Sequence, residues 1–192
     1  KREKLVKIVS HDVERIERLI TDYSQILKDE VALTTEKMNE IDLKSIVRSV
    51  VDDFNSIYIE KRRIQIDLNI DSLEKEFKIF GIENRIEQII ANLLDNAVSF
   101  SDDNKRIIVE IKKDQNGKII LRVIDQGQGF KEKNLSRIFD RFYSNRPDKF
   151  GKHSGLGLNI VKNLVELHGG VITASNNSNQ IGAEIKISFP KV

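Results

Sequence analysis

Glycine is concentrated in one part of this chain, because seven of its ten glycines lie between residues 127 and 170. Glycine has no Cβ, so such a cluster indicates tight turns and close approaches of the backbone. Two of these turns have a defined form: Asp125-Gln-Gly-Gln-Gly129 follows an apolar alternating segment, and Ser154-Gly-Leu-Gly-Leu158 opens an amphipathic one. We therefore expect a binding pocket built from these turns, with the rest of the chain as its scaffold.

The apolar periodicity predicts what surrounds these turns. Helical spacing of apolar residues predicts helices over 42–61, 82–98 and 156–167, the first capped by Asp42. Alternation predicts strands over 38–41, 64–70, 77–80, 107–111, 119–123, 171–175 and 183–189, with a hairpin turn at Asn116-Gly117. The predicted fold class is α+β, a two-layer α/β sandwich with helices on one face of a mixed sheet.

Residues 126–154 are rich in glycine and charge, and contain one short helical segment around 135–142. Irregular segments of roughly 25 residues inside a compact domain are usually functional. We expect this segment to form a lid over the pocket.

The N-terminal segment has a different pattern, a heptad seam over residues 4–31. A helix with so wide an apolar face is not stable alone in water. We expect it to pair with its copy in a second chain, which makes a homodimer; the alternative is that it folds back on its own domain. The seam consists of Val6, Val9, Val13, Ile16, Ile20, Tyr23 and Leu27.

Composition excludes several classes of partner. The net charge of +2 is too small to indicate nucleic acid or an anionic membrane as the main partner. The absence of cysteine excludes disulfides and thiolate metal sites. The sequence has no apolar run long enough to span a membrane and no signal peptide. Because the chain begins at Lys1, we expect it to be a fragment whose membrane anchor lies upstream.

Two groups of polar residues suggest contacts to a nucleotide. Asn92 and Asn96 are four residues apart, so they share a helix face. Their amide oxygens, together with phosphate oxygens and water, suit Mg²⁺. The alternative is a solvated pair of asparagines. Asp125 follows a strand and could accept a hydrogen bond from the exocyclic amine of adenine; the alternative is an ordinary turn.

The second glycine turn suggests a phosphate site. Gly155-Leu156-Gly157 opens a helix, where free N–H groups and the helix dipole favour an anion. The pattern is neither a Walker loop, because no Gly-Lys-Ser/Thr follows, nor the dinucleotide fingerprint, because the third glycine is missing.

Taken in this order, these motifs resemble those of the two-component sensor histidine kinases. Residues 87–192 are similar to the catalytic ATP-binding domain of that family, within the superfamily that includes gyrase and mismatch-repair ATPases. The matching motifs are Asn92-Leu-Leu-Asp-Asn-Ala97, Asp125-Gln-Gly-Gln-Gly129, Ile138-Phe-Asp-Arg-Phe-Tyr143, Ser154-Gly-Leu-Gly-Leu158 and Leu167-His-Gly-Gly170. The run Asn96-Ala-Val-Ser-Phe-Ser101, with the segments after Phe142 and Phe150, is similar to alphaproteobacterial acid- and host-sensing kinases.

The resemblance implies roles for these residues. Asn96 holds the Mg²⁺ that bridges the ATP phosphates, and Asn92 assists. Asp125 binds the adenine amine, and Gly127 and Gly129 shape that wall of the pocket. Further implied positions are Phe139 and Phe142 as anchors of the lid, and Gly155, Leu156 and Gly157 at the phosphates and the lid hinge.

The chain departs from the family where a lysine and an arginine are common, since Ser99 and Ser144 stand there. Arg141 and Arg146 are the candidates to meet the phosphate charge instead. Hydrolysing members of the superfamily have a glutamate where Asn92 stands. An amide cannot accept a proton, which fits phosphoryl transfer to a side chain rather than hydrolysis.

The implied activity is transfer of the ATP γ-phosphoryl group to a histidine, for relay to the receiver domain of a response regulator. Residues 1–33 then form the C-terminal helix of the dimerisation bundle, and 34–192 the catalytic domain. The implied location is the cytoplasmic portion of a sensor anchored in the inner membrane. The alternatives are an ATP-hydrolysing clamp of the same superfamily and a dimerising pseudokinase.

We expect a different role for each of the three histidines. His11 lacks the family's downstream proline, and residues 12–22 resemble the second helix of the bundle, so the phosphoacceptor is expected upstream of Lys1 with His11 as the alternative. His153 is expected to be a solvated loop residue, with proximity to phosphate as its alternative. His168 is expected to be structural, at a helix end whose dipole favours its protonated form.

Overall fold

The computed structural model describes residues 36–74, 76–143, 155–177 and 182–192, and residues 13, 16, 20 and 24 singly. Of the expected heptad seam, Val13, Ile16 and Ile20 are described; all three are helical and exposed. The remaining seam residues lie outside the described part of the chain. The homodimer and the boundary at residue 33 therefore stay predictions.

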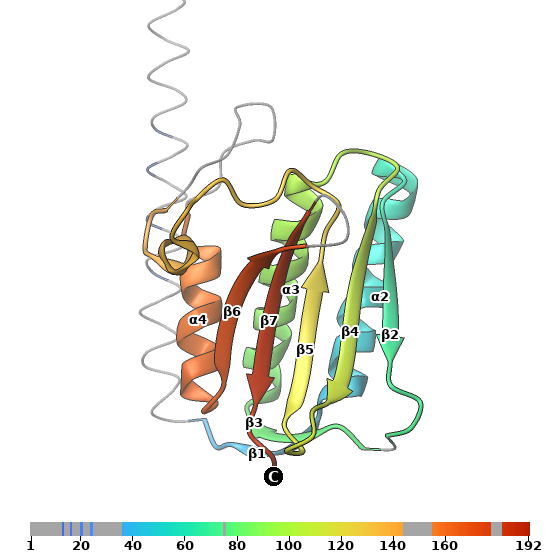
Figure 1. The fold of residues 1–192 in the computed structure, drawn as a ribbon, viewed down its shortest axis with the longest axis vertical. Helices are drawn as coiled ribbons and strands as arrows, with labels where there is room; N and C mark the ends of the chain where they lie inside the picture. The colour runs from blue at the N-terminus through green and yellow to red at the C-terminus, as the bar shows by residue number, and fades with distance from the viewer. Residues whose placement is uncertain are drawn as a thin grey trace, which may run out of the picture.

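A five-stranded mixed sheet forms one layer of the molecule (Figure 1). The strand order is β2-β4-β5-β7-β6. The parallel pair is β2 with β4, and the other neighbours are antiparallel. The strands span Gln65–Ile70 (β2), Arg106–Lys113 (β4), Ile119–Ile124 (β5), Val171–Asn176 (β6) and Ala183–Phe189 (β7).

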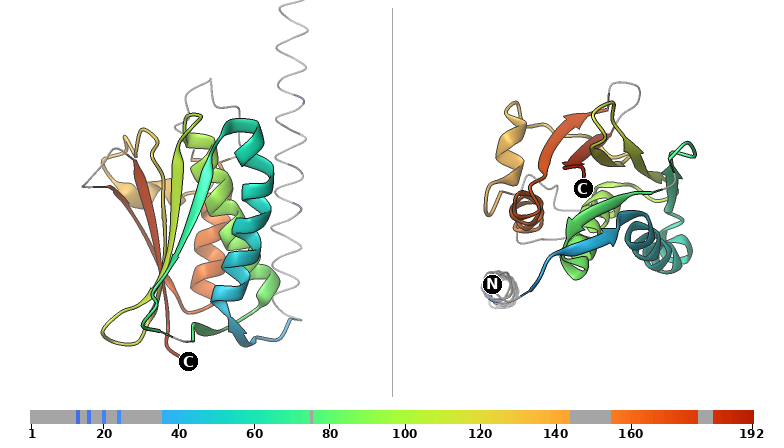
Figure 2. Two further views of the ribbon diagram at one scale, coloured as in Figure 1. Left: turned by 90° about the vertical axis from the view of Figure 1, so that its right-hand side faces the viewer. Right: turned by 90° about the horizontal axis from the view of Figure 1, so that it is seen from below.

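The helices form the second layer, on one face of this sheet (Figure 2). They span Leu43–Arg62 (α2), Glu83–Phe100 (α3) and Gly157–Leu167 (α4), and a 3₁₀ helix spans Leu135–Phe139 (η1). Within the described ranges, no helix has the length and apolar character needed to cross a bilayer. The predicted two-layer α+β class is confirmed.

The local sequence explains why these elements form and where they pack. Asp42 caps α2, because its carboxylate accepts a hydrogen bond from Lys44 N at 3.2 Å. In β4, alternate residues turn toward the helices and are buried. In α3, apolar residues at helical spacing are buried against the sheet and the neighbouring helices. The fully buried apolar side chains of α3 and β4 include Ile86, Ile89, Ile90, Leu94, Ile107, Val109 and Ile111.

Two features differ from the expectations. The short strands β1 (Asn39–Asp42) and β3 (Lys78–Gly81) pair with each other in a separate two-stranded sheet. The helical segment expected around 135–142 is a 3₁₀ helix that ends at Phe139. Asp140 follows with an extended backbone, ψ 149°, and so ends the helix.

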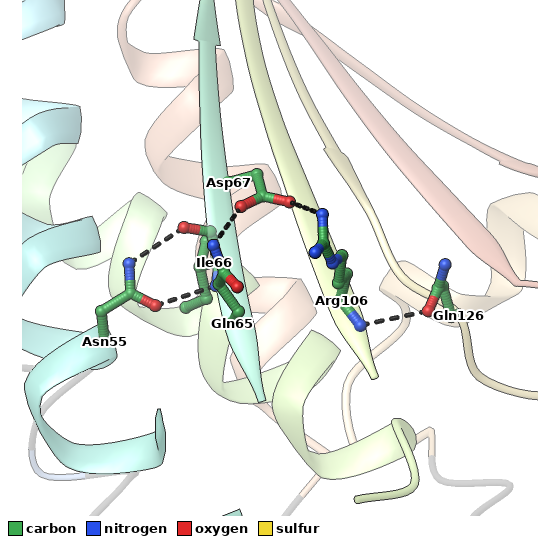
Figure 3. Close-up of polar contacts among 6 residues, drawn as sticks. All are labelled: Asn55, Gln65, Ile66, Asp67, Arg106 and Gln126. Atoms are coloured by element: carbon green, nitrogen blue, oxygen red, sulfur yellow. Dashed lines mark hydrogen bonds and ion pairs between the residues drawn. The ribbon is translucent and has the colours of Figure 1, made fainter. Parts of the chain in front are cut away.

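Asn55 of α2 closes the edge of the sheet at β2 (Figure 3). Its Nδ2 donates to Ile66 O at 2.9 Å, and Ile66 N donates back to Asn55 Oδ1 at 2.8 Å. Unpaired backbone groups on an edge strand can recruit another strand. By pairing both groups of Ile66, Asn55 removes one such position.

A polar chain also crosses the sheet near the beginning of β4 (Figure 3). Asp67 accepts from Gln65 Nε2 at 2.8 Å and lies 3.4 Å from Arg106 Nη1. The backbone N–H of Arg106 in turn donates to Gln126 Oε1 at 3.1 Å. This contact connects β4 to the first glycine turn.

His168 connects the end of α4 to the beginning of α3. Its Nδ1 lies 2.6 Å from Leu164 O, and Ile82 N donates to its Nε2 at 3.1 Å. These partners require a neutral ring with the proton on Nδ1. Burial lowers the pKa of His168, and the hydrogen bond to Leu164 only partly opposes this. The expected structural role is therefore supported, whereas burial and the bond accepted from Ile82 N oppose the protonation that the helix end was expected to favour.

The neutral His168 should make stability pH-dependent. Because its pKa is lower in the folded than in the unfolded chain, its contribution is complete above the unfolded value of 6.5 and is lost as pH falls from there through the folded pKa. His168→Gln should cost about 1–2 kcal/mol near pH 7.5, through the lost buried hydrogen bonds, and this deficit should shrink on acidification. Urea unfolding of both proteins between pH 8 and pH 5 measures it. A deficit that stays constant across this range would contradict the assignment.

Candidate functional site

The predicted site residues come from three elements that meet at one end of the molecule. The C-terminal half of α3, the end of β5 and the beginning of α4 lie at the same end of the sheet (Figure 1). The chain directions of these elements explain the arrangement, because α3 and β5 run toward that end of the sheet and α4 runs away from it. The two glycine turns are thereby brought near the asparagine-bearing part of α3.

Asp125 directly follows β5 and is buried. Its Oδ1 accepts hydrogen bonds from Gly127 N at 2.8 Å and from Ala183 N at 3.0 Å. Burial raises the pKa of Asp125, and these two backbone hydrogen bonds partly oppose the rise. Among the described residues the hydrogen bonds to this side chain all go to Oδ1. The second oxygen is thus available to a donor on a ligand.

Gly127 allows the Asp125 turn to pass against the end of α3. A Cβ at position 127 would lie 2.5 Å from the carbonyl oxygen of Phe100. That oxygen belongs to backbone at the end of a helix and cannot move aside as a flexible side chain would. Only glycine therefore permits this close approach.

Gly129 is held in a left-handed conformation, φ 72°, beside Asn176 at the end of β6. Phe130 N donates to Asn176 Oδ1 at 2.6 Å, and Asn176 Nδ2 donates to Phe130 O at 2.9 Å. These two bonds fix the exit of the first glycine turn. Sequence reasoning missed Asn176, since a strand-terminal asparagine gives no local signal of so distant a partner.

Asn92 and Asn96 lie on successive turns of α3 and are half-buried. Neither side-chain amide makes a hydrogen bond to another residue in the described part of the chain. A half-buried amide without a protein partner needs water or a ligand. Gly157 faces this pair, because a Cβ placed there would lie 3.7 Å from Asn92 Oδ1. The amide pair and the beginning of α4 are therefore neighbours.

Within the described ranges, no side chain caps the beginning of α4. Its N-cap is Leu156, which is buried and offers no side-chain acceptor. Gly155 precedes it with φ 74°, and a Cβ there would lie 2.7 Å from Tyr143 O. The first N–H groups of α4 are thus presented without a capping side chain, as an anion site requires.

Phe139 helps to anchor the segment before the second glycine turn. Phe139 is buried, and its carbonyl oxygen accepts from Asn159 Nδ2 of α4 at 2.8 Å. Phe142 is 58% exposed and has a positive φ of 63°. Phe142 therefore does not pack into the core as Phe139 does, and its expected role as an anchor of the lid stays a prediction because residues 144–154 lie outside the described part of the chain. Asn159 was missed from the sequence, where it reads as a polar residue in an apolar helix.

The structure describes only some of the basic residues that were considered for contacts to phosphate. Arg141 is exposed, at the end of the described segment. Arg146 and His153 lie outside the described residues, as do His11 and the part of the expected lid from 144 to 154. Their roles stay predictions. Among the described residues no cluster of three or more histidine or acidic side chains could hold a metal ion.

Comparison with known proteins identifies the family. The profile described as "Histidine kinase-, DNA gyrase B-, and HSP90-like ATPase" matches residues 81–192. The sensor protein ChvG of Agrobacterium fabrum is 34% identical, over 98% of this chain and 33% of its own length. The sensor protein KdpD of Clostridium acetobutylicum is 33% identical, over 100% of this chain and 21% of its own length. The chain spans about a third or less of these relatives.

Solved structures give the same fold. The catalytic domain of histidine kinase ThkA aligns with a TM-score of 0.69 at 25% identity, over 81% of this chain and 97% of that domain. The mycobacterial sensor histidine kinase MprB aligns with a TM-score of 0.67 at 24% identity, over 80% of this chain and 97% of its own. The family profile covers more than half of the chain and includes all of the motifs discussed above. The chain belongs to the histidine kinase-, DNA gyrase B- and HSP90-like ATPase family.

Proposed function

We propose that this chain is the ATP-binding catalytic core of a sensor histidine kinase and donates the ATP γ-phosphoryl group to a histidine imidazole. The observation that carries the proposal is the meeting of a buried carboxylate, two half-buried amides and an uncapped helix terminus at one end of the fold. These groups match, in order, an adenine amine, a magnesium ion and phosphate oxygens. The sensor proteins named above support the same assignment.

Asp125 forms the base end of the site. With Oδ1 held by two backbone N–H groups, Oδ2 accepts a hydrogen bond from the exocyclic amine of adenine. Gly127 and Gly129 keep the adjoining backbone free of side chains, so a flat ring can lie against it. A base with a carbonyl oxygen in place of the amine would face the carboxylate with a second acceptor.

Asn96, assisted by Asn92, forms the metal end. Amide oxygens are neutral hard ligands, and Mg²⁺ in nucleotide sites takes few protein ligands, the rest being phosphate and water. Among the described residues neither amide has a hydrogen-bond partner, which fits that use. The bound ion supplies neutralisation of phosphate charge. Gly155, Leu156 and Gly157 offer their N–H groups to the phosphates, and Arg141 and Arg146 are the candidates for further positive charge.

Asn92 favours transfer over hydrolysis. A general base must accept a proton from attacking water, and an amide at this place beside Gly157 does not do so. Phosphoryl transfer to an imidazole nitrogen needs mainly positioning and charge stabilisation. The chain's own residues therefore bind and orient ATP, and a histidine supplies the nucleophile.

The remaining parts of the proposal concern the longer protein. Residues 1–33 form the last helix of a dimerisation bundle, 34–192 form the catalytic domain, and two copies pair through the helix. The phosphoryl group passes from the histidine to a response regulator; ThkA has been solved in complex with the response regulator protein TrrA. The chain then belongs to the cytoplasmic part of a membrane-anchored sensor, whose acceptor histidine lies upstream of Lys1.

Incubation with radiolabelled ATP tests this function. The full-length protein should acquire phosphate that is labile in acid and stable in base, as a phosphohistidine is, and the present chain should bind ATP with Mg²⁺ without labelling itself. Sustained release of inorganic phosphate by the chain would favour the hydrolysing clamp instead. Absence of nucleotide binding would favour the pseudokinase. Acid-labile phosphate on His11 would place the acceptor within this chain.

A further inference from the structure

Arg62, the last residue of α2, lies outside every motif described above and yet contacts the end of α3. Its Nη1 donates to Val98 O at 2.8 Å and its Nη2 donates to Ser101 O at 2.7 Å. Its Nε donates to Asp103 Oδ1 at 2.7 Å. One guanidinium thus binds two carbonyls and one carboxylate of the α3 terminus and the loop after it.

The end of α3 needs such a partner. The last carbonyl groups of a helix have no acceptor role within the helix, and the last turn of α3 contains no basic residue. Ser101 after it is fully buried, and its Oγ donates to Ala97 O at 2.8 Å. The Arg62 guanidinium therefore adds a donor to Val98 O, which also accepts from Ser101 N at 3.3 Å, and a donor to Ser101 O just after the helix. Its positive charge complements the helix dipole.

The loop after α3 is also tied to Arg62 through the backbone. Asn104 N donates to Arg62 O at 3.1 Å, and Asn104 adopts a positive φ of 61°. Further along, Arg106 N donates to Gln126 Oε1. The loop is thus held by α2 on one side and by the first glycine turn on the other.

The first glycine turn packs against the end of α3, so the position of the α3 terminus affects the position of this turn. Phe100, whose carbonyl oxygen would lie 2.5 Å from a Cβ at position 127, lies between the two residues whose carbonyls Arg62 binds. A change in the path of residues 98–101 would move the Phe100 carbonyl against Gly127. Gly127 in turn donates its N–H to Asp125, the base-binding carboxylate.

We propose that Arg62 is a positioning residue for the base end of the nucleotide site: by binding the carbonyls of Val98 and Ser101, it fixes the backbone against which the Asp125 turn packs. This inference rests on the proposed function. Arg62 touches no part of the ligand and acts through Phe100 and Gly127. Its loss should weaken recognition of the base more than recognition of the phosphates, which Asn92, Asn96 and α4 bind.

Calorimetric titration with the non-hydrolysable analogues of ATP and GTP, each with Mg²⁺, tests the proposal. Wild type should prefer the ATP analogue. Arg62→Ala should raise the Kd of the ATP analogue about tenfold, equivalent to about 1.4 kcal/mol. The Kd of the GTP analogue should change less than twofold. The ratio of the two constants is the readout, because a general loss of structure would lower both affinities equally.

Three variants separate the contributions. Asp103→Ala removes the carboxylate and keeps both carbonyl contacts of Arg62, so it should retain most of the preference. Arg62→Lys, which places one ammonium near the same carbonyls, should retain part of it and serves as the test if Arg62→Ala does not fold. Arg48→Ala, exposed on the same helix, is the matched control and should change neither constant.

Equal weakening of both analogues, or an unchanged ratio in a folded Arg62 variant, would overturn the positioning role. Failure of wild type to bind the ATP analogue would instead overturn the proposed function. The two failures are therefore distinguishable.

Discussion

Asp125→Asn is expected to weaken binding of an ATP analogue at least about 100-fold, or about 2.7 kcal/mol, while the fold stays intact. The amide oxygen can still accept from Gly127 and Ala183, so the local backbone keeps both hydrogen bonds. The amide nitrogen then replaces Oδ2 and directs N–H donors at the adenine amine. A favourable hydrogen bond to a charged acceptor is lost, and two donors are left facing each other.

The same substitution should not reduce stability, and near neutral pH it should increase it. Because burial raises the pKa of Asp125, its ionised form carries a folding cost above that pKa, and the cost disappears as pH falls through it toward 3.8. The gain in Asp125→Asn should therefore be present near pH 7 and absent in acid. Calorimetry measures binding, and urea unfolding at neutral and acidic pH measures stability.

Asp52→Asn, an exposed carboxylate on α2, is the control for the loss of one charge, and it should leave both quantities unchanged. Unchanged affinity in Asp125→Asn would remove this carboxylate from the base end of the site. Loss of folded structure would instead show that its charge, rather than its acceptor geometry, supports the turn.

Asn96→Ala is expected to abolish the contribution of Mg²⁺ to nucleotide binding and to slow phosphoryl transfer by the full-length protein at least about 100-fold, which is about 2.7 kcal/mol in the barrier. The half-buried amide has no protein partner within the described residues, so its removal breaks no bond of the fold there. Unfolding free energy should change by less than about 1 kcal/mol.

Titrations of an ATP analogue with Mg²⁺ and with EDTA separate this effect from binding of the base. In wild type the two affinities should differ, and in Asn96→Ala they should coincide at the EDTA value. Asn163→Ala, exposed on α4, is the matched control. A magnesium dependence that survives in Asn96→Ala would exclude this amide as a ligand.

The elements could be predicted because each has a local cause. Helices α2, α3 and α4 each bury one face at helical spacing, and the β4–β5 hairpin turns at Asn116-Gly117. The pairing of β2 with β4 could not be predicted in this way. It is parallel and requires a crossover through β3 and α3, and the alternation in β2 is the same for any neighbour.

The candidate site was predictable where its residues lie within one short motif. Asp125, Gly127 and Gly157 are recognisable because their residue types and spacing follow a pattern that can be read locally. The supporting contacts are long-range, and nothing adjacent in sequence indicates them: Asn176 reaches Phe130 across 46 residues, and Arg62 reaches Val98 across 36. The difference in burial between Phe139 and Phe142 could not be predicted, because two aromatic residues three apart look equivalent in a helical pattern.

One helix, α3, sets the distance between the two ends of the proposed site. The 18-residue α3 carries Asn92 and Asn96 about 6 Å apart along its axis, and at its last residue carries the carbonyl that abuts Gly127. Because an α-helix keeps a constant rise per residue, it fixes the distance between the two ends of the proposed site. A redesign for a longer or shorter ligand would therefore have to change α3 first.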